Sequence, residues 1–344
     1  MQNDEFGRVQ ALGLLSALDL LSQLLDPSAV DPFEGHDACK CHFTLLAVLT
    51  WRREEHTPCE NRAVPGIIDA AANQLRVARR LAPRRGASLG ERFGRLDDRL
   101  VFVIGSPRSG TTFLAEAIGS LPGFVDLGEV APVKAAVPEL AALAPDEASR
   151  RLRRILNVSR RVGLVGSVRA VEQTPELAHL VTAIPSAFPE SVVVHIVRDG
   201  RDVACSLLEK PWLRREQVEA DDAGVPYGAY ARFWVEPDRR AEFETASDAR
   251  RAAWVWRSYV AAARAGAGVE IRYEAMAADP YATAAALAPH LEIPVAPLAD
   301  ALSRAHAASV GRHLTDLSAE QLGDVEAEAG ALLRELGYVS SASA

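Results

Sequence analysis

Residues 100–114, which read LVFVIGSPRSGTTFL, decide the fold. The uninterrupted apolar run at 100–104 is typical of a strand that is buried on both faces of a parallel sheet. Gly105 ends this run, and a helical pattern begins after Gly110. A helix that starts here presents unpaired backbone N–H groups, and its dipole favours a negative charge at the same place. The segment therefore predicts an anion-binding loop between a strand and a helix.

The loop differs from the common nucleoside triphosphate loop at one position. Gly105 and Gly110 have the spacing of G-x-x-x-x-G-K-[ST], but Thr111 stands where the lysine would be. That lysine reaches the β- and γ-phosphates, and the hydroxyl after it holds Mg²⁺. Without it, the loop suits a shorter anion held by backbone N–H groups, threonine hydroxyls and the Arg108 guanidinium. A kinase is thereby disfavoured, and a turn that only connects two elements remains the plain alternative.

Outward from this loop, strands alternate with helices. Apolar runs predict strands at 191–197 and 269–273, and helical patterns predict helices at 112–120, 135–162, 201–209 and 249–265. This alternation favours an α/β fold with a parallel sheet. Residues 1–98 have a helical pattern, notably at 12–25 and 67–81, whereas 210–245 has little periodicity and predicts an irregular insertion.

Composition limits the function. The chain has 344 residues, 49% of them hydrophobic, and 38 Lys+Arg against 46 Asp+Glu, a net charge of −8. A protein with this negative net charge has no overall positive potential to attract nucleic acid. Any anion that it binds must therefore be held by a local cluster of positive or hydrogen-bonding groups. Four cysteines point to a reducing compartment. The acidic N-terminus and the absence of an apolar run of about 20 residues predict a cytoplasmic protein without a secretory signal or a membrane span.

A second anion anchor is predicted after the strand at 191–197. Arg198 ends that strand, and ligands bind at the carboxyl ends of strands in open α/β sheets. Ser206 lies eight residues later on the following helix and can reach the same anion. The plain alternative is a surface ion pair between Arg198 and Asp202, which would contribute little.

The two anchors together resemble those of the sulfotransferases that use 3′-phosphoadenosine-5′-phosphosulfate (PAPS). Residues 107–112, PRSGTT, match the P-[RK]-S-G-T-T loop of this family in its arginine form, which is similar to bacterial and Golgi members. The resemblance implies a three-layer, P-loop-like α/β fold with a central parallel sheet and an N-terminal helical extension. It divides the chain into a helical region at 1–98, a sulfotransferase domain at 99–338 and a flexible tail at 339–344.

The resemblance also implies an activity and a set of binding residues. The enzyme would move a sulfuryl group from PAPS, by in-line displacement and without a metal, to a hydroxyl or amine of a small-molecule, sugar or lipid acceptor. The implied PAPS-binding residues are Arg108, Ser109, Gly110, Thr111, Thr112 and Phe113 for the phosphosulfate, and Arg198, Ser206 and Arg312 for the 3′-phosphate. A P-loop nucleotide kinase and a nucleotide-binding protein without catalysis remain as alternatives.

Glu129 is the predicted general base, with Arg108 as the second catalytic residue. Relatives of the bacterial and Golgi type place a catalytic glutamate in a Gly-Glu pair after the first helix, and residues 128–129 resemble that pair. Glu172 is the alternative base. Gln173 stands where many bacterial relatives carry lysine, so it can form hydrogen bonds but supplies no charge.

Other polar and aromatic residues are weaker candidates. His179 and His195 could serve as bases, although His195 lies inside an apolar strand and is interpreted as a core histidine. Two clusters complete the set: a cysteine–histidine group at 39–59, whose spacing does not fit a zinc site, and aromatic residues at 212–256, around an acceptor-facing loop at 221–228.

Overall fold

The computed structural model describes residues 94–163, 165–210, 213 and 233–339. The predicted N-terminal helices, the cysteine–histidine group and the acceptor-facing loop at 221–228 lie outside these residues.

A five-stranded sheet in the order β2-β3-β1-β4-β5 forms the centre of the fold, and every neighbouring pair is parallel. The strands are β1 (Val101–Ile104), β2 (Phe124–Asp126), β3 (Arg169–Glu172), β4 (Val192–Val197) and β5 (Val269–Arg272). The three predicted strands, β1, β4 and β5, are confirmed to within one residue. Strands β2 and β3 were not predicted, because β2 has three residues and β3 carries a charged residue at each end.

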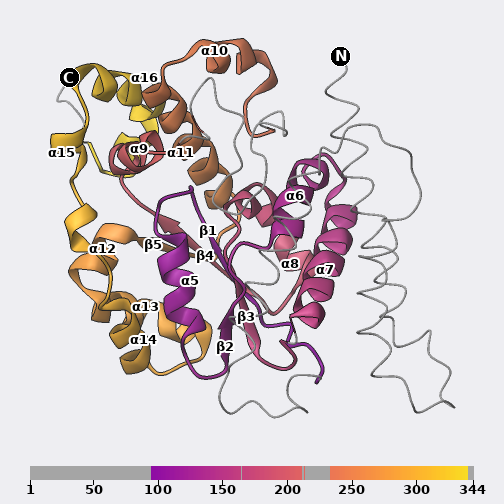
Figure 1. The fold of residues 1–344 in the computed structure, drawn as a ribbon. Helices are drawn as coiled ribbons and strands as arrows, with labels where there is room; N and C mark the ends of the chain where they lie inside the picture. Colours follow the sequence, from indigo (N-terminus) through magenta and orange to yellow (C-terminus); the bar gives the residue numbers. More distant parts are fainter. Residues whose placement is uncertain (1–93, 164, 211–212, 214–232, 340–344) are drawn as a thin grey trace, which may run out of the picture.

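Helices cover both faces of this sheet (Figure 1). One face carries α5 (Thr111–Gly119), α12 (Tyr273–Ala278), α13 (Pro280–Leu291) and α14 (Val295–Leu302). The other carries α6 (Ala131–Leu140), α7 (Pro145–Val162), η3 (Pro175–Ala183), α8 (Ile184–Ala187), α9 (Gly200–Leu208), α11 (Asp248–Arg264) and α16 (Ala319–Glu335). The three-layer α/β class predicted from the sequence is confirmed.

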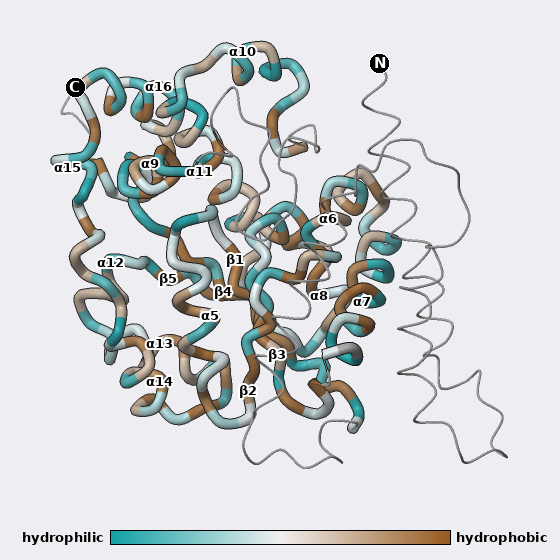
Figure 2. Tube along the Cα trace, viewed as in Figure 1, coloured by the Kyte–Doolittle hydropathy of each residue, from teal (hydrophilic) through white to brown (hydrophobic). Residues whose placement is uncertain are grey.

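Alternation along β1 explains the two cores. Val101 and Val103 pack into the cluster under α5, whereas Phe102 and Ile104 pack into the cluster on the opposite face. Side chains of a strand point alternately to the two faces, so an all-apolar strand must be covered on both. In Figure 2 the central strands are coloured toward the hydrophobic end of the scale.

Two predicted boundaries were wrong. The helix predicted at 135–162 is two helices, α6 and α7, because Ala144 is extended in front of Pro145, which then begins α7. The segment predicted to be irregular contains η6 (Pro237–Arg239) and α10 (Arg240–Thr245). Periodicity alone did not reveal such short helices. Among the described residues, no helix combines the length and apolar character needed to cross a membrane.

Candidate functional site

The predicted site residues meet at one edge of the sheet. Arg108 lies in the loop after β1, Glu129 follows β2, Gln173 follows β3 and Arg198 follows β4. Because the strands are parallel, their carboxyl ends all lie at this edge, which is where open α/β sheets bind ligands. Both predicted anion anchors are therefore on the same side of the molecule.

The loop after β1 has features that suit an anion. Gly110 caps α5 in a left-handed conformation (φ 99°), and neither a side-chain cap nor an acidic residue in the first turn satisfies the helix N-terminus. Ser109 is fully buried, and its hydroxyl has no hydrogen-bond partner among the described residues. Arg108 also has positive φ (71°) and is exposed. The loop thus brings together the N-terminal N–H groups of α5, the Ser109 hydroxyl and the Arg108 guanidinium.

The two anchors are in direct contact. The Arg108 Nε donates a hydrogen bond to the Ser206 Oγ at 2.9 Å, although the two residues are 98 positions apart. Ser206 lies on α9 and is 6% exposed. The contact brings the loop after β1 and the helix after β4 to one place, as the two-anchor interpretation requires.

Arg198 is held in a buried position. Its guanidinium carbon lies 4.8 Å from the centre of the Tyr273 ring, and its Nη2 donates to the Ser309 carbonyl oxygen. Its own carbonyl accepts a hydrogen bond from Trp256 Nε1 at 2.9 Å. The Arg198 side chain is 7% exposed, and its Nε has no partner among the described residues. The Nε is thus a buried donor without a described partner, which suits this guanidinium to bind an anion.

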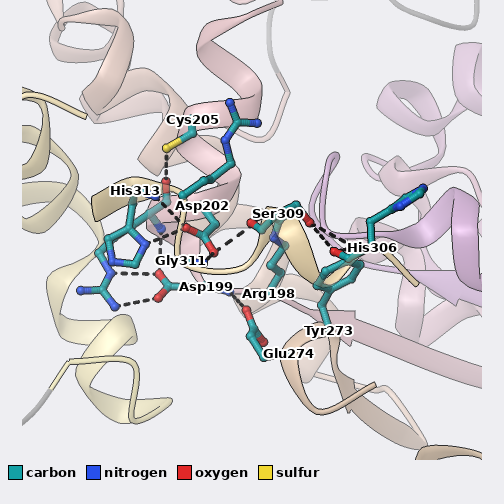
Figure 3. Close-up of polar contacts among 12 residues, drawn as sticks. Arg198, Asp199, Asp202, Cys205, Tyr273, Glu274, His306, Ser309, Gly311 and His313 are labelled. Atoms are coloured by element: carbon teal, nitrogen blue, oxygen red, sulfur yellow. Dashed lines mark hydrogen bonds and ion pairs between the residues drawn. The ribbon is translucent and has the colours of Figure 1, made fainter. Parts of the chain in front are cut away.

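The ion pair between Arg198 and Asp202 that the plain alternative predicts is present, but both side chains are buried and do not lie at the surface. Arg198 Nη2 lies 3.9 Å from Asp202 Oδ2, and the Asp202 side chain is 1% exposed. Asp202 also accepts hydrogen bonds from the backbone N–H groups of Gly311, at 2.7 Å, and His313, at 3.0 Å. Its Oδ1 also lies 2.6 Å from the His313 Nδ1 (Figure 3). Asp202 therefore ties the turn at 309–313 to α9, a role that sequence reasoning missed.

Arg312 has acidic neighbours. It forms ion pairs with Glu209, at 2.5 Å, and Asp316, at 2.8 Å, and its side chain is 26% exposed. The hydrogen bonds that Arg312 donates to these carboxylates raise its pKa. To contact a phosphate, Arg312 would have to exchange these partners, so its role stays a prediction. Arg201 on the same edge donates to Asp199 and to the carbonyl of Tyr338.

The two candidate bases have different surroundings. Glu129 is 23% exposed and accepts a hydrogen bond from Lys134 Nζ at 2.6 Å. Glu172 is fully buried and accepts hydrogen bonds from the Thr174 hydroxyl and backbone N–H. Burial raises the pKa of Glu172 to about 8, so at neutral pH this carboxyl holds its proton. The geometry thus favours Glu129 over Glu172 as the base.

The remaining polar candidates are buried. His195 is fully buried with its Nδ1 3.1 Å from Glu270 Oε2, which confirms the core interpretation. His179 packs against the rings of Tyr259 and Phe233, with centroids 4.6 and 5.2 Å away, and burial lowers its pKa to about 4. Gln173 is 3% exposed, and its Oε1 has no partner among the described residues.

Replacing Gly110 with alanine is expected to destabilise the fold, because the added Cβ would collide with a ring at the candidate site. An added Cβ would lie 2.7 Å from Tyr273 Cδ2, the ring that supports Arg198. Overpacking of this kind costs about 1–3 kcal/mol. Gly123→Ala is the matched control, because Gly123 also has positive φ (84°) but has nothing within 4 Å of an added Cβ. Urea denaturation should show the larger loss for Gly110→Ala. Equal losses in the two variants would mean that the Tyr273 contact is unimportant.

Glu172→Gln is expected to change how stability depends on pH. The pKa of Glu172 is raised from an ordinary 4.5 to about 8, so between these values the folded protein holds a proton that the unfolded chain has lost. Stability therefore falls as pH rises through this window, by up to about 1.4 kcal/mol per pH unit from this group. Glutamine cannot ionise, so the variant should lose this slope and gain most over wild type near pH 8. If the free energy of unfolding, measured by denaturation at each pH, depended on pH in the same way in the variant and in wild type, a buried, protonated Glu172 would be contradicted.

The geometry defines an α/β protein with a candidate anion site at the carboxyl edge of a parallel sheet. Residues 154–297 match the model of the sulfotransferase family, the family that the sequence resembles. The matched residues include Arg198 and Ser206, whereas the loop at 107–112 lies before them. The match supports sulfotransferase activity.

Three solved structures are similar to the chain over most of its length. Sulfotransferase STF9 from Mycobacterium avium has 13% identity and a TM-score of 0.42, over 89% of this chain and 98% of that one. STF1 from Mycobacterium tuberculosis H37Rv has 14% identity and a TM-score of 0.40, over 96% and 93%. The sulfotransferase domain of the Synechococcus PCC 7002 olefin synthase has 14% identity and a TM-score of 0.41, over 70% and 95%. A comparison with the curated proteins found no match.

Proposed function

We propose that the chain is a PAPS-dependent sulfotransferase, which moves a sulfuryl group to a hydroxyl or amine of a small-molecule, sugar or lipid acceptor. The hydrogen bond between Arg108 and Ser206 carries this proposal. This bond holds the loop after β1, which suits the phosphosulfate, next to helix α9, which suits the 3′-phosphate. PAPS carries both groups, so its binding requires the two anchors to lie close together. The low cysteine content fits the reducing cytoplasm, which we propose as the location.

The described residues fit such a nucleotide. Buried donors without partners lie in both anchors, namely the Ser109 hydroxyl and the Arg198 Nε. The residues that would hold the phosphosulfate are Arg108, Ser109, Gly110, Thr111, Thr112 and Phe113, and those that would hold the 3′-phosphate are Arg198, Ser206 and Arg312. When bound, PAPS supplies an activated sulfuryl group.

The transfer requires a base for the acceptor's proton and groups that stabilise the developing negative charge. Residues at the edge of the sheet would fill both roles. Glu129 would take the proton from the acceptor, a contribution of about 10²–10⁴-fold for a positioned base. Arg108 and the hydroxyls of Thr111 and Thr112 would oppose the charge that develops on the transferred group and the leaving nucleotide. Gln173 can orient a polar group, but it adds no charge to this site.

Calorimetric titration with adenosine 3′,5′-bisphosphate (PAP) and with ATP·Mg²⁺ tests the nucleotide. We expect PAP to bind and ATP·Mg²⁺ to bind more weakly, and the reverse order would favour a kinase. Incubation with radiolabelled PAPS and a cell extract then tests transfer and identifies the acceptor from the labelled product. PAP binding without transfer to any acceptor would make the chain a nucleotide-binding protein without catalysis.

A further inference from the structure

Asp202 holds the turn at 309–313 through both of its carboxylate oxygens. The Gly311 N–H donates to Oδ2 at 2.7 Å, and the His313 N–H donates to Oδ1 at 3.0 Å. The His313 ring adds a third contact, because its Nδ1 lies 2.6 Å from the same Oδ1. Both side chains are buried. Leaving a buried carboxylate without its donors is costly, so Asp202 strongly favours this one position of the turn.

The two backbone contacts lie on either side of Arg312. Gly311 and His313 are its neighbours in the sequence, so Asp202 fixes the stretch of backbone that carries Arg312. Gly311 completes the turn with a left-handed φ of 78°, which suits glycine. Figure 3 shows Gly311 and His313 converging on Asp202. The backbone position of Arg312 therefore depends on a residue of α9.

The same turn also orients Arg198. Arg198 Nη2 donates a hydrogen bond to the Ser309 carbonyl oxygen. The Tyr273 hydroxyl contacts the His306 carbonyl oxygen at 3.1 Å and the Ser309 Oγ at 3.2 Å, so the ring that lies against this guanidinium is tied to the turn as well. One turn thus joins the two arginines proposed for the 3′-phosphate, Arg198 through Ser309 and Arg312 through its own backbone.

We propose that Asp202 and His313 are positioning residues that make the protein prefer a nucleotide with a 3′-phosphate. They hold the turn at 309–313 so that Arg198 and Arg312 meet at one phosphate group. The inference rests on the proposed function, because that function assigns both arginines to this phosphate. A phosphate monoester has several acceptor oxygens, so two guanidinium groups at one place bind it more strongly than one does. If the turn were not held, its ordering on binding would cost conformational entropy and lower the affinity.

Asp202→Asn measures the contribution of the carboxylate. Asparagine keeps the shape but has one acceptor oxygen, so its NH₂ group would face one of the two backbone N–H donors. PAP and adenosine 5′-monophosphate (AMP), which lacks the 3′-phosphate, are titrated calorimetrically into wild type and variant. We expect the affinity for PAP to fall by about 10- to 150-fold, the equivalent of one hydrogen bond to a charged group, while that for AMP stays close to wild type. A role in folding alone would leave the ratio of the two affinities unchanged.

His313→Phe and His313→Asn test the ring contact and do not depend on the folding of the Asp202 variant. Phenylalanine keeps a buried ring without the Nδ1 contact, and asparagine places an amide nitrogen near the position of Nδ1. The affinity for PAP relative to AMP should fall in His313→Phe and be largely restored in His313→Asn. His290→Phe is the matched control, because His290 is exposed beside Leu291, whose carbonyl accepts a hydrogen bond from Arg169 at the start of β3, at the opposite edge of the sheet.

The possible outcomes separate this inference from the proposed function. If PAP binds wild type but the ratio of the two affinities is the same in folded Asp202→Asn and His313→Phe proteins, the inference is overturned and the proposed function stands. A ratio that fell equally in His290→Phe would also overturn the inference, because the effect would not belong to this turn. If PAP does not bind wild type, the proposed function fails and the inference fails with it.

Discussion

Arg198→Ala is expected to weaken PAP binding by about 30- to 3,000-fold, which corresponds to about 2–5 kcal/mol for truncating one partner of a buried charge pair. The guanidinium is buried over Tyr273, and its Nε has no partner among the described residues, so the 3′-phosphate would meet an already oriented donor. Alanine removes both the charge and the orientation. Calorimetric titration with PAP measures the loss directly.

Two further variants test whether the loss of PAP affinity is specific to the Arg198 guanidinium. Arg201→Ala removes an arginine three residues away that is bound to Asp199 and Tyr338, so PAP affinity should change by less than about fivefold. Arg198→Lys keeps a charge but loses the planar group that stacks on Tyr273, and it should give an intermediate affinity. PAP affinity close to that of wild type in a folded Arg198→Ala protein would remove the second anchor from the site.

Glu129→Gln is expected to lower turnover by about 10²–10⁴-fold while PAP binding stays unchanged. Glutamine has the same shape and can still accept the hydrogen bond that Lys134 donates to Glu129, but it cannot take a proton. The loss should therefore appear in kcat. Transfer of the radiolabelled sulfuryl group, measured beside a PAP titration, separates catalysis from binding.

Glu172→Gln provides the comparison for this result. Glu172 is fully buried and bonded to Thr174, so its replacement should leave most of the turnover in place. Retained turnover in Glu129→Gln, together with loss in Glu172→Gln, would move the base to Glu172.

The sequence predicted the parts of the fold that local patterns encode. An apolar run such as 100–104, bounded by a glycine, is typical of a strand buried on both faces, and the glycines after it define the loop. The same reasoning found β4 and the position of Arg198 at its end. Strand β3 was missed, because Arg169 and Glu172 interrupt its apolar pattern. These polar ends are satisfied by tertiary contacts, Arg169 by backbone carbonyls and Glu172 by Thr174.

The contacts that complete the site could not be predicted in this way. Asp202 and the turn at 309–313 are more than 100 residues apart along the chain, and no local pattern links them. The pairing of Lys134 with Glu129 and Glu176 depends on how α6 packs against η3. Such pairings arise from the tertiary fold, so sequence reasoning named Glu129 but not the residue that accompanies it.

The position of Tyr273 limits how the donor preference of this protein could be redesigned. A single ring lies against Gly110 and under Arg198, and its hydroxyl contacts His306 and Ser309. Under the proposed function, reshaping the site around Arg198 to admit a nucleotide without the 3′-phosphate would also disturb the loop at Gly110 that is proposed to hold the phosphosulfate. Libraries for altered donor use should therefore vary both ends together around an unchanged tyrosine, since changes made one at a time are expected to be non-additive.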